Sequence, residues 1–81
     1  MPKIFEWNGY KFFFFSNEGE PLEPAHVHVR KSGNLAKFWL MPDVKLSESW
    51  GFNSKELKQL LEKVKENKTF MMEKWNEYFN I

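Results

Sequence analysis

The residues best suited to chemistry lie in the segment His26-Val27-His28-Val29-Arg30. Its alternation of polar and apolar residues predicts a β-strand, in which residues two apart share a face at roughly 6.6–6.8 Å. Both histidines of the chain and its only arginine would then lie on one face, with the valines facing a core. Two imidazoles at this spacing can address one phosphate from two sides. The planar guanidinium of arginine suits phosphate or carboxylate.

This arrangement suggests cleavage of RNA or another phosphodiester, as in a metal-independent endoribonuclease. One histidine would accept the 2′-hydroxyl proton, and the other would protonate the leaving oxygen. Basic side chains beside them would stabilise charge that develops on phosphorus. The catalytic candidates are His26, His28, Arg30 and Lys37, and the candidates for substrate binding are Lys31 and Trp39.

Two other interpretations of the histidine pair remain open. The histidines can be structural, filling the polar face of a half-exposed strand while Arg30 reaches a loop glutamate such as Glu20 or Glu23. A metal site is the weaker interpretation, because two imidazoles leave at least one ligand to be found. Asp43 and the glutamates of the loop before the strand are the candidates for it. We therefore assign no metal ligand and expect no cofactor.

A first hairpin is predicted before this strand. Asn8-Gly9, the strongest two-residue hairpin signal, separates the strands Lys3–Trp7 and Tyr10–Phe15. A type I′ turn would pair Trp7 with Tyr10, Glu6 with Lys11, Phe5 with Phe12 and Ile4 with Phe13. The aromatic run of the second strand could stack on RNA bases. Rings more often fill the core of a small domain, which is the interpretation we favour.

A second hairpin contains the histidine strand itself. It runs from His26–Lys31 through Ser32-Gly33-Asn34 and returns along Leu35–Leu40. Its register puts the valines with Ala36, Phe38 and Leu40, and the histidines and arginine with Leu35, Lys37 and Trp39. Val44–Leu46 could add one further short strand.

The C-terminal part of the chain is predicted to be helical. Asn53 and Glu56 match a capping box, and apolar residues then follow helical spacing as far as Phe79. Asn67-Lys68-Thr69 interrupts that pattern, so the segment is either one helix or two joined near Asn67. The sequence thus predicts one α+β domain, residues 1–81. Its small antiparallel sheet of two N-terminal hairpins, with three or four strands, packs against one long or two short helices.

Composition limits the classes of protein to which the chain can belong. With no cysteine, the chain cannot be a disulfide scaffold or hold a thiolate zinc site. Its longest apolar run, Phe12–Phe15, is far short of the ~20 residues of a membrane span, so we expect a soluble cytoplasmic protein without a membrane partner. The net charge is +1, but between His26 and Leu46 four basic residues oppose only Asp43. This local excess weakly favours an anionic partner.

Several motifs resemble one bacterial family. They are Met1-Pro2, Gly9-Tyr10, Ser16-Asn17-Glu18, His26-Val27-His28-Val29-Arg30-Lys31, Ala36-Lys37-Phe38-Trp39-Leu40 and Trp75-Asn76-Glu77-Tyr78-Phe79. Together they are similar to the small domain-of-unknown-function family 4160. Leu22-Glu23-Pro24-Ala25 departs from its pattern, because Pro-Pro is expected directly before the first histidine.

The resemblance implies a genetic context rather than an activity. Members are encoded beside a small protein of family 2442, in an arrangement similar to a toxin–antitoxin pair. This chain would be the toxin, with RNA or the translation machinery as its target. The leading hypothesis is therefore a toxin-like protein that acts on RNA through the histidine strand. The alternative is a non-catalytic module that docks an aromatic surface on a partner protein.

Overall fold

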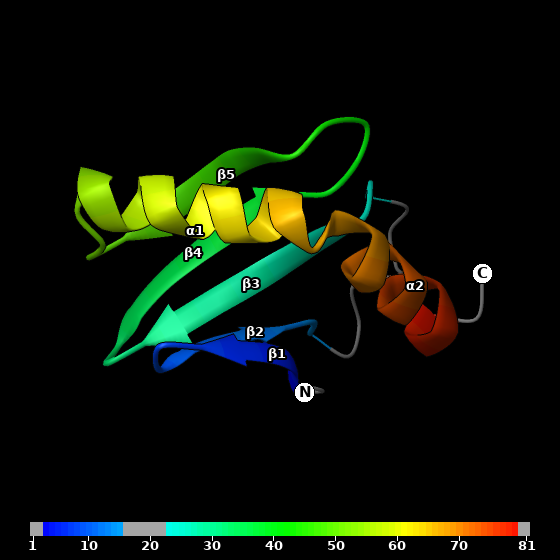
Figure 1. Ribbon diagram of the computed structural model, residues 1–81, viewed down its shortest axis with the longest axis horizontal. Coiled ribbons are helices and arrows are strands. Elements are labelled where there is room, and N and C mark those ends of the chain that lie inside the picture. The colour runs from blue at the N-terminus through cyan, green and yellow to red at the C-terminus, as the bar shows by residue number, and fades with distance from the viewer. Residues whose placement is uncertain (1–2, 16–22, 80–81) are drawn as a thin grey trace.

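The computed structural model describes residues 3–15 and 23–79, which form one antiparallel sheet and two helices (Figure 1). The elements are β1 (Lys3–Trp7), β2 (Tyr10–Phe13), β3 (His26–Lys31), β4 (Asn34–Trp39), β5 (Lys45–Trp50), α1 (Ser54–Glu66) and α2 (Lys68–Phe79). The five strands lie in the sheet in chain order. This confirms the predicted α+β fold, with five strands where three or four were expected.

The first hairpin has the predicted turn and most of the predicted register. Asn8 and Gly9 have φ values of 50° and 80°, as a type I′ turn requires. The predicted pairing of Ile4 with Phe13 is wrong, because the register shifts in β1 and Lys3 pairs with Phe13. Such a bulge inserts one extra residue in one strand. It allows both Ile4 and its neighbour Phe5 to pack against the core.

The second hairpin gives the sheet two distinct faces. β3 and β4 are joined by Ser32 and Gly33, whose φ values are 51° and 82°. On one face, called the core face, Val27 and Val29 pair with Phe38 and Ala36. On the other, called the outer face, the pairs are His26 with Trp39, His28 with Lys37 and Arg30 with Leu35. Both assignments agree with the sequence prediction.

Strand β5 is longer than the segment Val44–Leu46 that the sequence predicts. Residues 47–50 lack apolar alternation, so their own pattern does not mark them as a strand. They are extended because they pair with β4, with Trp50 opposite Leu35 and Glu48 opposite Lys37. This pairing adds Trp50 to the outer face.

The C-terminal segment forms two helices, one of the two predicted alternatives. At the start of α1, the Asn53 side chain accepts from the Glu56 N–H at 2.8 Å. The Glu56 carboxylate accepts in turn from the Asn53 N–H at 3.1 Å, which completes the capping box. At the end of α1, the Asn67 side-chain amide donates to the Lys63 carbonyl at 2.9 Å. Because Asn67 caps the helix in this way, the chain turns there and begins α2.

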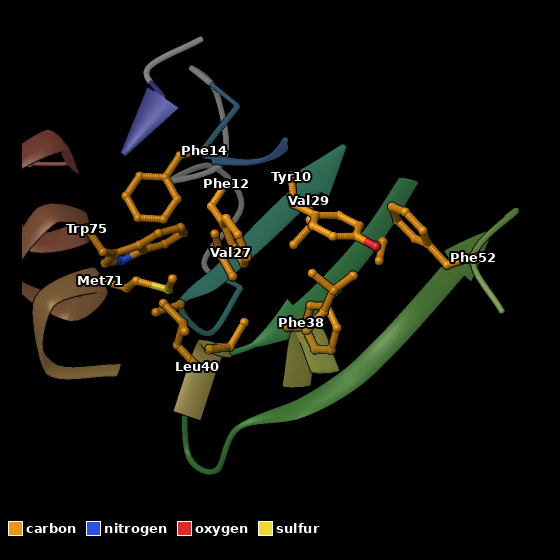
Figure 2. Packing of buried hydrophobic residues seen from close by; sticks show 14 residues of the cluster. Tyr10, Phe12, Phe14, Val27, Val29, Phe38, Leu40, Phe52, Met71 and Trp75 are labelled. Carbon is orange, nitrogen blue, oxygen red and sulfur yellow. The ribbon is translucent and has the colours of Figure 1, made fainter. Parts of the chain in front are cut away.

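The core lies between the core face of the sheet and the helices. Leu60 and Val64 of α1 are buried in the same cluster as the strand valines. α2 lies at one end of the sheet (Figure 1), where Trp75 packs on Phe14 with ring centroids 5.1 Å apart. Figure 2 shows Met71 of the same cluster beside the Trp75 ring. In the ranges 3–15 and 23–79, no helix is long and apolar enough to cross a membrane.

Candidate functional site

The two histidines lie inside the domain. His26 is 1% exposed and His28 is 6% exposed, so the prediction of a half-exposed polar face is wrong at these positions. The ring of His26 lies 5.3 Å from that of His28, 5.5 Å from Trp39 and 5.3 Å from Trp75. Trp75 belongs to α2, which reaches the histidine strand across about 50 residues of sequence. The sequence pattern of the strand alone could not reveal this cover.

The main chain fixes the orientation of His26. Its Nδ1 lies 2.9 Å from the Pro24 carbonyl oxygen. A carbonyl only accepts hydrogen bonds, so Nδ1 carries a proton and donates it. The Glu23 carboxylate lies 3.8 Å from the same nitrogen. His26 thus holds the chain that enters β3 in place.

His28 lies among phenylalanine rings. It stacks on Phe13 at 5.7 Å between ring centroids, and Phe15 lies 4.3 Å away. With both imidazoles enclosed in this way, a phosphodiester can touch them only after these side chains move.

Lys37 is engaged by neighbouring side chains. Its ammonium group forms an ion pair with Glu23 at 3.0 Å and lies 4.5 Å above the Trp39 ring. The side chain of Lys37 is 15% exposed. Glu23, a proposed partner of Arg30, thus binds Lys37 instead, while Glu20 lies outside the described residues. The charge of Lys37, which was predicted to stabilise a phosphate, is therefore already paired with a carboxylate.

Arg30 and Lys31 separate from the other predicted residues. Arg30 is exposed on the outer face, and four strand positions place it about 13 Å along β3 from His26. Lys31 lies on the core-face side, where its ammonium contacts the Tyr10 ring at 4.4 Å and donates to the Asn8 carbonyl at 3.0 Å. The predicted catalytic and substrate-binding residues therefore do not converge on one point.

Arg30 instead belongs to a different group on the outer face. Glu6 of β1 lies opposite Lys11 of β2. From Lys11 onward, the strand register aligns Lys11, Arg30, Leu35 and Trp50 across β2, β3, β4 and β5. We call these four residues the outer row. Lys11 and Arg30 are exposed, Leu35 is half-buried and Trp50 is 56% exposed. At the usual spacing of adjacent strands, the row extends over about 14 Å.

Sequence reasoning placed Arg30 and Leu35 on one face, but it did not include Lys11 or Trp50 there. Lys11 carries a usable signal, because it is the charged residue that alternates with Tyr10 and Phe12 in a predicted strand. Trp50 carries none, since its segment was not predicted to be a strand. Only the pairing of β5 with β4 places it beside Leu35.

The described residues also bear on the metal interpretation. Within 3–15 and 23–79, no three histidine, aspartate or glutamate side chains are grouped so that they could hold a metal ion. Asp43, one predicted third ligand, is therefore not part of such a group. Glu18 and Glu20 lie outside the described ranges.

A polar contact on the core face connects the sheet to α1. The Tyr10 hydroxyl donates to the Glu56 carboxylate at 2.9 Å. Burial, followed by this hydrogen bond, raises the pKa of Tyr10. The Asn53 N–H, followed by the Tyr10 hydroxyl, lowers the pKa of Glu56. Both shifts belong to a structural contact on the face opposite the outer row.

Comparison with known proteins gives one match. The sequence model of the family described as Domain of unknown function (DUF4160) matches residues 9–76. The matched range includes the second hairpin and the outer row. No curated protein and no solved structure matches the chain.

Proposed function

This chain belongs to the DUF4160 family, and we propose that it binds single-stranded RNA through the outer row. The observation that carries the proposal is the alignment of two exposed cations, Lys11 and Arg30, with the exposed indole of Trp50. α1 packs on the opposite face of the sheet (Figure 1).

The side chains of the outer row suit the parts of a single strand. Unpaired bases stack on aromatic side chains, and such a stack contributes about 1–3 kcal/mol per base. Trp50 offers the aromatic ring, with Leu35 beside it. Arg30 and Lys11 offer positive charge for the phosphates. In a duplex the bases stack on one another, so the row favours a single strand.

The proposal assigns binding to this surface and gives the histidines a structural role in it. The burial of His26 and His28 and the bond from His26 to Pro24 support that role. RNA cleavage by the two imidazoles is a further step, which requires the enclosing rings to open. If the chain is the toxin of a pair, the outer row is the surface that a family 2442-like antitoxin would block.

A second candidate function is a protein-interaction module. Three exposed apolar side chains favour it: Met41 is 41% exposed, Leu46 38% and Trp50 56%. All three lie on β5 or in the connection that precedes it. Because apolar docking depends little on salt, while phosphate contacts weaken steeply as salt rises, the salt dependence of binding separates the two functions.

Fluorescence anisotropy with a labelled single-stranded RNA tests the proposal. Trp50→Ala should weaken binding about tenfold, the effect of losing one stacked base. Tyr78→Ala is the matched control, because Tyr78 is a 42% exposed aromatic residue on α2. Arg30→Ala should lower the salt slope by about 0.7, the value for one phosphate of a single strand. Lys58→Ala removes the same charge at an exposed position on α1 and should leave the salt slope unchanged.

Two results would contradict RNA binding by the outer row. One is the absence of binding at low salt. The other is equal affinity of the Trp50→Ala and Tyr78→Ala variants. Cleavage is followed in the same samples on a gel, at a temperature at which circular dichroism shows the His26→Ala and His28→Ala variants to be folded. If the histidines are structural, the folded variants should match the parent.

A further inference from the structure

A pocket of about 280 Å³ lies at the turn end of the two hairpins. Its lining residues are Gly9, Lys11, Arg30, Lys31, Ser32 and Gly33. Three of these six carry positive charge, and none carries negative charge. The pocket is thus a small basic cavity on a chain whose net charge is only +1.

The strand register explains why the pocket forms there. β2 and β3 pair only as far as Lys11 and Arg30. The turn that contains Gly9 and the turn that contains Gly33 both extend beyond this last pair. Figure 1 shows the two turns at the same end of the sheet. The pocket lies where the hairpins are no longer paired with each other.

One wall of the pocket is held in position by Lys31. This side chain crosses the first turn, since a Cβ placed on Gly9 would lie 3.4 Å from Lys31 Cε. The Lys31 ammonium is fixed by its bond to the Asn8 carbonyl and by its contact with the Tyr10 ring. A cation that is ordered before binding loses less entropy when a ligand arrives.

The chemistry of the lining suits a compact, multiply charged anion. Arg30 can donate two parallel hydrogen bonds to a phosphate, and the two lysines add point charges. Ser32 adds a hydroxyl donor. Gly33 lacks a side chain, and a Cβ placed there would meet no atom within 4 Å, which leaves the main chain of the second turn open to a close ligand.

We propose that this pocket binds one phosphate group. The inference deepens the proposed function and rests on it, because Arg30 both lines the pocket and belongs to the outer row. A strand with a phosphate in the pocket would continue past Leu35 to Trp50. The phosphate can be the 5′-terminal group of the strand or one within its backbone.

Amide chemical shifts measured during a titration with inorganic phosphate test the pocket directly. The amides of Gly9 and Gly33 should shift in a saturable way. Lys31→Met keeps an unbranched apolar side chain over Tyr10 but removes the charge, so it should weaken phosphate binding about tenfold. Lys31→Arg should restore most of it, and Lys45→Met is the matched control, since Lys45 is an exposed lysine of β5 outside the pocket.

Oligonucleotides with a 5′-phosphate or a 5′-hydroxyl identify the source of the phosphate. If the group is terminal, the phosphorylated strand binds more tightly and Lys31→Met removes the difference. If it is internal, both strands bind equally and Lys31→Met weakens both. Either result supports the pocket. Unchanged Gly9 and Gly33 amides with every ligand, or equal binding by parent and Lys31→Met in every arm, overturns it.

The two proposals can fail separately. If phosphate binds in the pocket but the protein has no affinity for RNA, the phosphate site is supported and the proposed function is refuted. If RNA affinity depends on Trp50 but not on Lys31, and phosphate causes no shift of the pocket amides, the proposed function is supported and the phosphate site is refuted.

Discussion

Replacement of His26 by alanine distinguishes a histidine that supports the fold from one that only serves chemistry. His26 is 1% exposed, its ring contacts Trp39 and Trp75, and its Nδ1 donates to the Pro24 carbonyl at 2.9 Å. Alanine removes the ring contacts, leaves a cavity and deprives that carbonyl of its donor. The substitution should therefore lower the free energy of unfolding.

The expected loss is large for a domain of this size. Truncation of a large buried side chain costs about 2–5 kcal/mol, and a lost neutral hydrogen bond costs about 1 kcal/mol. Imidazole is smaller than the larger apolar side chains, so we expect about 3 kcal/mol in total. Domains are stable by about 0.05–0.15 kcal/mol per residue, which gives roughly 4–12 kcal/mol for this chain. The melting temperature should fall by roughly 12–24 °C.

Urea unfolding followed by far-ultraviolet circular dichroism measures this loss. Arg30→Ala is the control, because Arg30 is exposed and its charge lies 5.4 Å from the Phe13 ring, a contact worth at most about 1 kcal/mol. If His26→Ala is as stable as the parent to within about 0.5 kcal/mol, the structural assignment of His26 is refuted.

Two further predictions concern α1 and the turn before it. The Asn53 N–H and the Tyr10 hydroxyl hold the pKa of Glu56 below its ordinary value. These two hydrogen bonds therefore stabilise the folded protein above about pH 4.3, and the stabilisation is lost as the pH falls through the folded-state pKa. The deficit of Glu56→Gln relative to the parent in urea unfolding should therefore shrink from pH 7 to pH 3; an unchanged deficit contradicts this. Gly51 has a φ of 90°, and an added Cβ would collide with the Asn34 side chain. Gly51→Ala should therefore lower the free energy of unfolding more than Gly33→Ala does. Gly33 has a similar φ of 82°, but a Cβ added there would lie in open space; equal losses of stability would refute the steric argument.

Local patterns were sufficient to predict much of the fold. Asn8-Gly9 specified the first turn, because few residues other than glycine and asparagine adopt positive φ at low cost. Strict alternation from His26 to Arg30 specified which side chains share a face. The capping box at Asn53 marked the start of α1. Each of these signals depends on residues within a few positions of one another.

The candidate site was predicted less well because exposure is not a local property. The alternation of β3 correctly separated the histidines from the valines, but it could not say whether the histidine face meets water. Trp75, on a helix distant in sequence, packs against His26, and Glu23 forms an ion pair with Lys37. Trp50 enters the outer row only through the pairing of β5 with β4.

The sequence by itself thus determined the two hairpins, the start of the helical segment and the membership of each face of β3. These features follow from backbone sterics and from the two-residue period of a strand, which act within a few residues. Only the tertiary structure decided that His26 and His28 are enclosed and that Lys11, Arg30, Leu35 and Trp50 form a row. It also decided that two turns border one basic pocket. These outcomes depend on which distant segments pack together, because burial and charge pairing are set by neighbours in space rather than in sequence.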